Sequence, residues 1–328
     1  MSDLDADRSR GARDAAPAIR ACRIHRFGGP EAIVLEEIPR PRPEAGEVLV
    51  RVEAAGVGPW DGWIRAGHST LPQPLPLTLG SDLSGVVAEL GAGVSGFAAG
   101  DPVFGVTNAR FTGAYADYAV AAAGMIARRP AALAPVEAAS VPVIAVTAWQ
   151  ALFEEARLTC GQSVLVHGAG GNVGRYAVQL ARRAGLRLVA TAGTRDIASV
   201  RELGADEVID YRATAFDDVV RDMDAVIDLV GGDVQARSLR VLRRGGRLVS
   251  AVSKPDQVAA QEVGVEAAFF LVEVTTERLD RIVGLIAAKQ VSTKVGAILP
   301  LASARTAHEM LEGVRSSPGG KIILVPGT

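Results

Sequence analysis

A hydrophobic segment that leads through a glycine cluster directly into a helix is the feature that most restricts the fold of this chain. Residues 163–174 read Ser-Val-Leu-Val-His-Gly-Ala-Gly-Gly-Asn-Val-Gly, and the helical pattern Arg-Tyr-Ala-Val-Gln-Leu-Ala-Arg-Arg follows them. Gly168 permits a tight turn, Gly171 permits close approach of the backbone to a ligand, and Gly174 lets the helix pack on the strand. We expect Asn172 to cap the helix. Backbone N–H groups at such a helix start bind pyrophosphate, so the turn predicts dinucleotide binding.

The glycine spacing departs from the strict Gly-x-Gly-x-x-Gly pattern, because Val173 stands at the place of its last glycine. The spacing that fits is one glycine in every third position from Gly168, and Gly170 adds a further residue without a side chain. Six residues of this turn are therefore predicted to contact the cofactor: Gly168, Gly170, Gly171, Asn172, Val173 and Gly174.

The end of the next predicted strand indicates which dinucleotide is bound. In NAD-binding proteins an acidic residue about 20 positions beyond the turn binds the ribose hydroxyls and would repel a 2′-phosphate. That place falls at Gly193 here. Thr194 can hydrogen-bond a phosphate and Arg195 can pair with it, although Asp196 lies beside them. These residues favour NADPH over NADH; the alternative interpretation is that Arg195 is a solvated residue at a helix start.

From about residue 141 onward, predicted strands alternate with predicted helices. The strands are 163–167, 186–192, 207–209, 225–229 and 247–252, with helices such as 173–184 and 197–203 between them. This alternation predicts right-handed βαβ units around a doubly wound parallel sheet. Amphipathic helices are expected at 276–289 and 302–314, and a last strand at 321–325 is expected to return to the first domain.

The N-terminal part of the chain carries the signals of a β-rich domain instead. Residues 47–54 alternate so that Val48, Val50 and Val52 share one face, and 86–90 and 103–106 are further short strands. Glycine and proline clusters separate these strands. The first 18 residues combine four acids and three arginines with one large apolar residue, so we expect a disordered arm.

Charge and composition exclude several classes of protein. Thirty-five basic and 37 acidic residues give a net charge of −2, which leaves no dominant positive field for nucleic acid or an anionic membrane. Two cysteines are too few for a disulfide framework or a four-cysteine zinc site. The longest apolar stretch, residues 138–153, is too short and too interrupted to span a bilayer. We therefore expect a soluble cytoplasmic protein with a small-molecule substrate.

The chain resembles the zinc-independent quinone oxidoreductases of the medium-chain dehydrogenase/reductase superfamily, from about residue 20 to residue 325. The glycine turn and six further segments carry this resemblance. The segments are Arg26-Phe-Gly-Gly-Pro30, Leu79-Gly-Ser-Asp-Leu-Ser-Gly-Val-Val87, Gly113-Ala-Tyr-Ala-Asp-Tyr118, Thr147-Ala-Trp-Gln-Ala-Leu152, Leu203-Gly-Ala-Asp-Glu-Val-Ile-Asp-Tyr211 and Asp228-Leu-Val-Gly-Gly232.

The resemblance implies two domains and the way in which the chain builds them. A GroES-like catalytic domain would comprise residues 19–142 and 291–328, and a Rossmann NADP-binding domain would comprise residues 143–290. A cleft between them would bring nicotinamide and substrate together. Relatives commonly form homodimers by pairing the edge strands of their Rossmann sheets, and residues 269–274 are the candidate strand here.

The resemblance also implies further cofactor contacts. In relatives the position of Tyr211 lies near the adenosine phosphate, and that of Thr147 lies close to the nicotinamide. Two turns, Val230–Gly231 and Val252–Ser253, would line the path of the cofactor. For each of these side chains the alternative is packing beneath the cofactor.

A catalytic zinc ion is not expected. Zinc-dependent alcohol dehydrogenases carry a cysteine near the segment equivalent to residues 56–61 and a histidine in a Gly-His-Glu motif. This chain has Gly58-Pro59 and Gly80-Ser81-Asp82 at those places, and its four histidines are scattered without ligand spacing. His167, directly before the glycine turn, is interpreted as a packed side chain.

The substrate segment departs from the pattern of the family. Relatives often carry an asparagine and a tyrosine in the segment equivalent to residues 56–67, where this chain has Gly58 and Trp63. An indole N–H can donate one hydrogen bond, and Trp60 and Trp63 would offer an aromatic wall for a flat ring. Both tryptophans could instead seal the domain interface. Asp61 and Tyr115 are the side chains nominated for proton handling.

Together these features predict an NADPH-dependent reductase that transfers hydride to a quinone or to an α,β-unsaturated carbonyl compound. The quinone is favoured, because its reduced anion can take a proton from water and needs no positioned acid. The altered substrate segment leaves open an NADPH-binding accessory or redox-responsive protein with little turnover. A third reading is another reductive or dehydrogenating role on the same fold, including an alcohol substrate.

Overall fold

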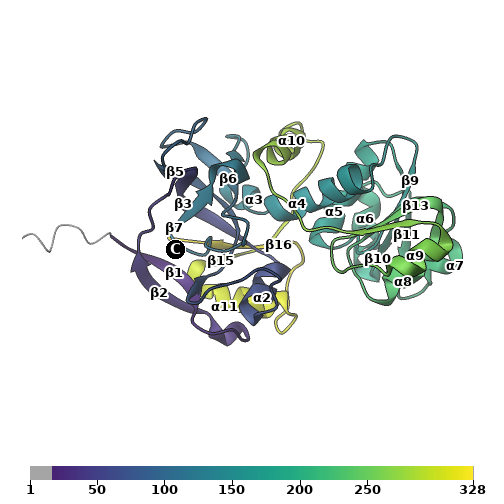
Figure 1. Ribbon diagram of the computed structural model, residues 1–328, viewed down its shortest axis with the longest axis horizontal. Helices are drawn as coiled ribbons and strands as arrows, with labels where there is room; N and C mark the ends of the chain where they lie inside the picture. Colours follow the sequence, from purple (N-terminus) through teal and green to yellow (C-terminus); the bar gives the residue numbers. More distant parts are fainter. Residues whose placement is uncertain (1–16, 328) are drawn as a thin grey trace, which may run out of the picture. The chain divides into compact units, whose positions relative to one another are not determined.

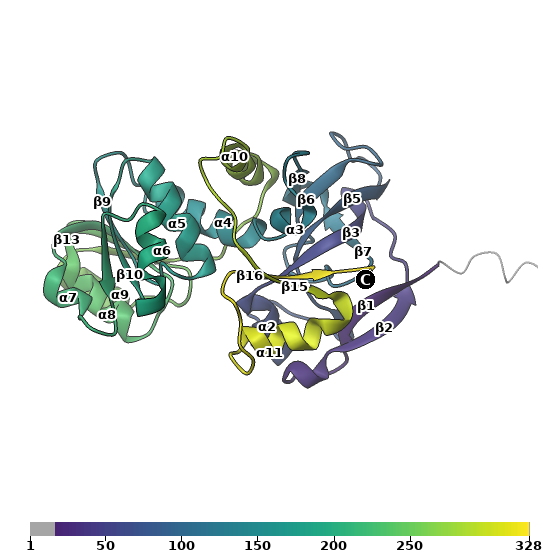
Figure 2. The same ribbon diagram turned by 180° about the vertical axis from the view of Figure 1, so that it is seen from behind.

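The computed structural model describes residues 17–327, which divide into two compact units (Figures 1 and 2). The first unit runs up to Arg129 and also includes Ala297–Ser317 and the chain from Ile322 onward; the second comprises Pro130–Gly296 and Pro318–Lys321. The sequence analysis placed the boundaries between the two domains near residues 142 and 290. The predicted arm lies outside the described residues apart from its last two, and Ala18 already begins strand β1 (Ala18–Ile24).

The first unit is built on a sheet in which β3 (Glu47–Val57) pairs antiparallel with three other strands. In the described residues the sheet order is β15 (Val295–Pro300), β16 (Lys321–Val325), β3, β5 (Asp82–Leu90), β6 (Pro102–Val106) and β8 (Ile126–Arg128), with β7 (Tyr118–Ala122) also paired to β3. A smaller sheet has the order β2 (Val34–Pro39), β1 and β4 (Leu77–Thr78). The described part of this unit also contains the helices α2 (Pro59–Ala66) and α11 (Ala304–Leu311) and the short 3-10 helices η1 (Pro30–Ala32), η2 (Ala123–Met125) and η6 (Leu301–Ser303).

The core of the first unit follows the alternation of β3. Val48, Val50 and Val52 are buried on one face, as the sequence predicts. Leu49 is also buried, so both faces of the sheet are covered at this point, whereas Arg51 is exposed. The last strand, β16, pairs antiparallel with β3, which confirms that the C-terminal segment returns to the first unit.

The second unit contains a parallel sheet of the doubly wound kind. Its strands lie in the order β11 (Glu207–Asp210), β10 (Arg187–Ala192), β9 (Ser163–Val166), β12 (Met223–Asp228), β13 (Leu242–Ser250) and β14 (Glu266–Phe269). The chain moves outward from β9 to β11, returns to β12 beside β9, and moves outward again to β14. The strand order thus reverses between β9 and β12, and ligands bind at the carboxyl ends of the strands at such a point.

Helices cover this sheet and follow its two halves. The helices are α3 (Pro135–Ala138), α4 (Pro142–Trp149), α5 (Asn172–Arg183), α6 (Ile197–Glu202), α7 (Phe216–Val219), α8 (Asp233–Ser238), α9 (Gln257–Val263) and α10 (Thr276–Ala287), with short turns η4 (Thr194–Asp196) and η5 (Leu239–Val241). A π-helical segment, η3 (Gln150–Glu155), follows α4 directly. Right-handed crossovers in opposite directions place α5 and α8 on opposite faces of the sheet. The fully buried strand residues between them form the core, among them Leu165, Val226 and Leu248.

The strand and helix predictions are confirmed with shifted ends. The largest shift is at β13, which begins at Leu242 and ends at Ser250, whereas the sequence predicted 247–252. The predicted edge strand at 269–274 is wrong in its position: the edge strand is β14, and residues 270–275 form no strand. The reason is that β14 pairs with β13 only as far as Ser250↔Phe269, where β13 ends. No helix within residues 17–327 is long and apolar enough to cross a bilayer.

Candidate functional site

The glycine turn joins the carboxyl end of β9 to the start of α5. Gly168 has a φ of +72°, which a glycine adopts without strain, and its carbonyl accepts a hydrogen bond of 3.0 Å from Gly171 N–H. Gly171 is the N-cap of α5 and has an extended backbone. The prediction that Asn172 caps the helix is therefore wrong: Asn172 is the first helical residue, and no side chain caps this helix.

Two glycines of the turn lie where a side chain would not fit. A Cβ at Gly174 would lie 2.3 Å from the Gly168 carbonyl oxygen and 2.6 Å from the Cα of Ala169. A Cβ at Gly170 would lie 2.7 Å from the Cβ of Asp196, so the Asp196 side chain lies against the turn. The first N–H groups of a helix have no acceptor within the helix. Those of α5 are left uncapped by any side chain and lie beside a turn whose one side chain, the methyl group of Ala169, is fully buried, which fits the phosphates of a dinucleotide.

The carboxyl ends of β10 and β11 form the next part of the site. The Thr194 hydroxyl donates a hydrogen bond of 2.6 Å to the Asp210 carboxylate, which also accepts from the backbone N–H of Arg212. These hydrogen bonds lower the pKa of Asp210. Gly193 lies beside the ring of Tyr211, since a Cβ there would be 3.4 Å from the Tyr211 hydroxyl.

The charges at this end are mixed. Arg195 is exposed, and the Arg212 guanidinium lies 5.9 Å from the centre of the Tyr211 ring, which is 57% exposed. Both cations favour a phosphate, whereas the carboxylates of Asp196 and Asp210 oppose one. The Thr194 hydroxyl, expected to serve a phosphate, already uses its proton on Asp210.

The turns after β12 and β13 continue the row on the other side of the glycine turn. A Cβ at Gly168 would lie 3.2 Å from a methyl group of Val230, so the first of these turns lies beside the glycine turn. A Cβ at Gly231 would lie 3.3 Å from the Ser253 hydroxyl and 3.3 Å from a methyl group of Val252. The structure thus brings the predicted residues of three neighbouring strands into one continuous edge. Val230 and Val252 are 50% and 37% exposed on it.

Thr147 lies on α4 rather than on these turns. Its side chain is largely buried, and its hydroxyl donates a hydrogen bond of 2.7 Å to the carbonyl of Val143 in the preceding helical turn. The contact with nicotinamide that the resemblance implies for Thr147 stays a prediction.

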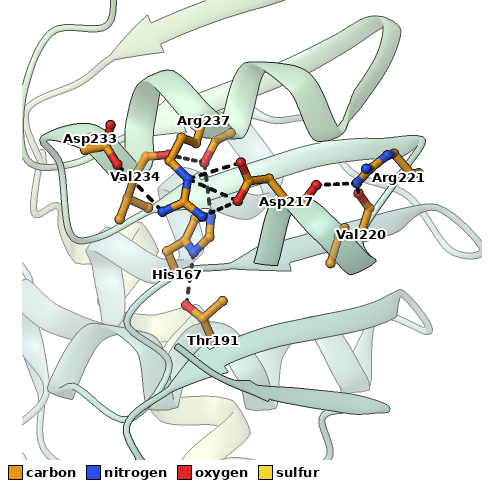
Figure 3. Close-up of polar contacts among 9 residues, drawn as sticks. His167, Thr191, Asp217, Val220, Arg221, Asp233, Val234 and Arg237 are labelled. Carbon is orange, nitrogen blue, oxygen red and sulfur yellow. Dashed lines mark hydrogen bonds and ion pairs between the residues drawn. The ribbon is translucent and has the colours of Figure 1, made fainter. Parts of the chain in front are cut away.

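His167 directly precedes the glycine turn in the chain and is a packed side chain, as the sequence suggests (Figure 3). Its Nδ1 lies 3.0 Å from the Thr191 hydroxyl, and its Nε2 lies 3.0 Å from the Ser238 hydroxyl. Its ring stands edge-on to Phe216, with ring centres 4.5 Å apart. Figure 3 also shows Arg237 above it, where the guanidinium binds the Asp217 carboxylate.

The hydrogen-bond network assigns the neutral tautomer of His167. The Ser238 hydroxyl donates to the carbonyl of Val234, so it can only accept from His167, and the ring proton is therefore on Nε2. Thr191 then donates to Nδ1. The pKa of His167 is lowered to about 4, mainly by burial; the negative charge of Asp228 opposes this shift, and the positive charge of Arg237 contributes to it.

In the first unit, Asp61 and Tyr115 contact each other and are both fully buried. The Tyr115 hydroxyl donates a hydrogen bond of 3.0 Å to an oxygen of Asp61, which also accepts from Gly58 N–H at 2.8 Å. Burial, and then the negative charge of Asp61, raises the pKa of Tyr115 well above its ordinary value. Through these hydrogen bonds the pair stabilises the start of α2. A role of Asp61 and Tyr115 in proton handling stays a prediction.

The two tryptophans of α2 differ in their surroundings. Trp63 is 51% exposed. Trp60 is half-buried, and its indole N–H donates a hydrogen bond of 3.0 Å to the Ser81 hydroxyl. A Cβ at Gly58 would lie 2.3 Å from the Trp60 ring, so the indole occupies the space that a side chain at Gly58 would need.

Within residues 17–327 no group of three His, Cys, Asp or Glu side chains could hold a metal ion. Burial raises the pKa of the Cys22 thiol to about 12, while Cys160 is exposed.

Three polar residues at the carboxyl ends of the parallel strands were missed by the sequence interpretation. Asp210, Asp228 and Ser250 each end a parallel strand. Asp210 and Asp228 lie within segments that carry the family resemblance. The signal that could have identified all three is a polar residue at the carboxyl end of a buried strand.

Comparison with known proteins gives matches over nearly the whole chain. Residues 44–131 match the family described as "Alcohol dehydrogenase GroES-like domain", and residues 203–324 match "Zinc-binding dehydrogenase". The quinone oxidoreductase of Mus musculus is 33% identical over 328 residues, which cover 94% of this chain and 98% of the relative. That of Homo sapiens is 33% identical over 325 residues, with the same coverage.

Solved structures agree with these relatives. A quinone oxidoreductase from Coxiella burnetii has a TM-score of 0.88 and 32% identity, covering 94% of this chain and 99% of its own. The Escherichia coli quinone oxidoreductase complexed with NADPH has a TM-score of 0.85 and 29% identity, covering 94% and 100%.

Proposed function

The chain belongs to the quinone oxidoreductase branch of the medium-chain dehydrogenase/reductase superfamily, and we propose that it reduces a quinone with NADPH without a zinc ion. An α,β-unsaturated carbonyl compound is the alternative acceptor. The observation that carries the proposal is the edge of the second unit, where the start of α5, a turn of three glycines and the buried Ala169, and the ends of four further strands lie in a row. The NADPH in the related E. coli structure supports the choice of cofactor.

Bound NADPH would supply the hydride. The residues of the chain would bind and orient it in distinct ways. The start of α5 would receive the pyrophosphate, and the missing Cβ at Gly174 lets this helix start pack directly against the backbone of Gly168 and Ala169. Arg195 and Tyr211 would lie at the adenosine end, beyond β10 and β11. The turns after β12 and β13 would then carry the nicotinamide half.

A quinone suits the substrate segment better than an enone does. Both nominated proton-handling groups, Asp61 and Tyr115, are buried and hydrogen-bonded to each other. A quinone needs no positioned acid from the protein, because water can protonate its reduced form. The exposed indole of Trp63 offers a flat surface against which an aromatic ring can stack.

We further propose a homodimer that forms through the edge strand β14. This strand pairs with β13 on one side and is the last in the order of the sheet. Size-exclusion chromatography with light scattering on the wild type and on a variant with proline in β14 tests this assembly, because proline removes a donor from the strand.

The first test is steady-state oxidation of NADPH, followed by its loss of absorbance, with benzoquinone, phenanthrenequinone and an alkenal. Each assay is repeated with NADH and with EDTA. Quinone-dependent turnover that prefers NADPH and ignores EDTA supports the cofactor, the reaction and the absence of zinc together. Tight NADPH binding without turnover on any acceptor would instead favour an accessory or redox-responsive protein.

A further inference from the structure

Asp228, the last residue of β12, is a fully buried carboxylate whose partners are hydrogen-bond donors. Its Oδ1 accepts from the backbone N–H groups of Val230 at 3.0 Å and Gly231 at 2.8 Å. Its Oδ2 accepts from the side-chain amide of Gln235 at 3.0 Å and from the Ser250 hydroxyl at 2.8 Å. Across residues 17–327 no ion pair involves it. These four hydrogen bonds hold the carboxylate in one position, and they hold the four donor groups in place as well.

Ser250 and Gln235 extend this arrangement to the turn after β13. The Ser250 hydroxyl donates to Asp228 and accepts from the backbone N–H groups of Val252 at 3.2 Å and Ser253 at 3.3 Å. The Gln235 amide that donates to Asp228 also donates to the carbonyl of Ser253 at 3.1 Å. One carboxylate therefore holds the turn after its own strand directly and the neighbouring turn through two side chains.

These two turns are the part of the edge that the nicotinamide half of a dinucleotide would reach. Val230 lies beside Gly168 of the glycine turn, and Gly231 lies against Val252 and Ser253. The adenosine half belongs on the opposite side of the glycine turn, at the ends of β10 and β11. The other half must then extend over β12 and β13.

We propose that Asp228 is a positioning residue for the nicotinamide half of the cofactor. It touches no cofactor atom itself: it is buried, and it acts by holding the backbone of 230–231 and 252–253 in place. The proposal rests on the proposed function, because it needs a nicotinamide cofactor on this edge. It predicts that a defect at Asp228 weakens one half of the binding site and spares the other.

The test is Asp228→Asn in the full chain, with calorimetric titration of two ligands. NADPH reports both halves of the site, and adenosine 2′,5′-bisphosphate reports the adenosine half alone. The new amide places a donor opposite the Gln235 amide and the Ser250 hydroxyl, so one acceptor is lost and the donors face each other. We expect the Kd for NADPH to rise by about ten-fold, and the Kd for the bisphosphate to change by less than about two-fold.

Asp224→Asn is the matched control, because Asp224 lies in the same strand near its opposite end. Its carboxylate also accepts from a backbone N–H and a hydroxyl, both of Ser163, at 2.7 and 2.9 Å. Both Kd values should stay at the wild-type level in this variant. Should Asp228→Asn fail to fold, Ser250→Ala carries the test, since it releases the turn after β13 alone and should weaken NADPH selectively.

The outcomes separate this proposal from the proposed function. Wild-type protein that binds neither NADPH nor NADH overturns both. If the wild type binds NADPH, the role of Asp228 is overturned when its variant binds NADPH equally well, or when it loses both ligands to the same extent. Selective loss of NADPH affinity, with a raised KM for NADPH and an unchanged KM for the quinone, supports the role.

Discussion

Acid should destabilise the second unit through His167, which is its only histidine. The side chain is 1% exposed, neutral, and hydrogen-bonded at both ring nitrogens. Burial is the main cause that lowers its pKa from 6.5 to about 4. Because the folded pKa lies below the unfolded one, the unfolded chain binds more protons between these values, and the free energy of unfolding falls as the pH falls.

The size of the effect follows from the shift. Each pH unit between 6.5 and 4 should remove about 1.4 kcal/mol, and the whole interval about 3 kcal/mol. Below about pH 4 this contribution becomes constant, because the folded protein is then protonated too. A loss of this size is a large part of the stability of an ordinary domain.

The assay is urea unfolding at a series of pH values, read from Trp149. The three tryptophans of the chain are Trp60, Trp63 and Trp149, so a Trp60→Phe, Trp63→Phe background leaves one reporter, in the second unit. Adding His167→Asn should flatten the pH dependence between 6.5 and 4 by about 1.4 kcal/mol per unit. The reasoning is refuted if the slope stays the same, or if NMR titration shows the His167 ring protonating near pH 6.5.

Three further substitutions test the site. Gly174→Ala places a methyl group 2.3 Å from a backbone oxygen of the glycine turn, and should raise the Kd for NADPH by about ten-fold or more, whereas Gly284→Ala, which meets nothing within 4 Å, should leave it unchanged. Gly58→Ala should displace the Trp60 ring and raise the KM for quinone more than the KM for NADPH; a KM for quinone equal to that of the wild type would contradict the packing of Trp60 against Gly58. Asp210→Asn removes a carboxylate from the adenosine end and should raise the ratio of NADPH to NADH affinity, measured by titration of both; a fallen ratio would place the 2′-phosphate elsewhere.

The sequence predicted the strand, the glycine turn and the helix of residues 163–183 well, because these elements are local. A buried strand, glycines and an amphipathic helix are contiguous in the chain, so Gly168, Gly171 and Gly174 were found from spacing alone. The N-cap was placed one residue too late. The sequence does not show whether Gly171 or Asn172 is the last extended residue before the helix. The end of β14 was misplaced because it depends on where its neighbour β13 stops.

The residues that were missed act across distance in the chain. Asp228 accepts a hydrogen bond from Ser250, 22 residues further along the chain, and this contact connects it to the turn after β13. The sequence analysis predicted that Thr194 can hydrogen-bond a phosphate, but its hydroxyl donates to Asp210, 16 residues away. No spacing rule links such pairs, because parallel strands place their carboxyl ends together only after the whole sheet has formed.

The substrate segment shows how a departure from the family pattern can be a coupled change. Gly58 looked like the loss of a polar side chain, yet the indole of Trp60 fills the space beside it and donates to Ser81. A larger residue at position 58 and this placement of Trp60 exclude each other sterically. The segment has thus exchanged a polar group for aromatic surface, with the exposed Trp63 one helical turn further on. Such a surface binds a flat ring by stacking and offers little to orient an aliphatic enone, which is why we place a quinone first.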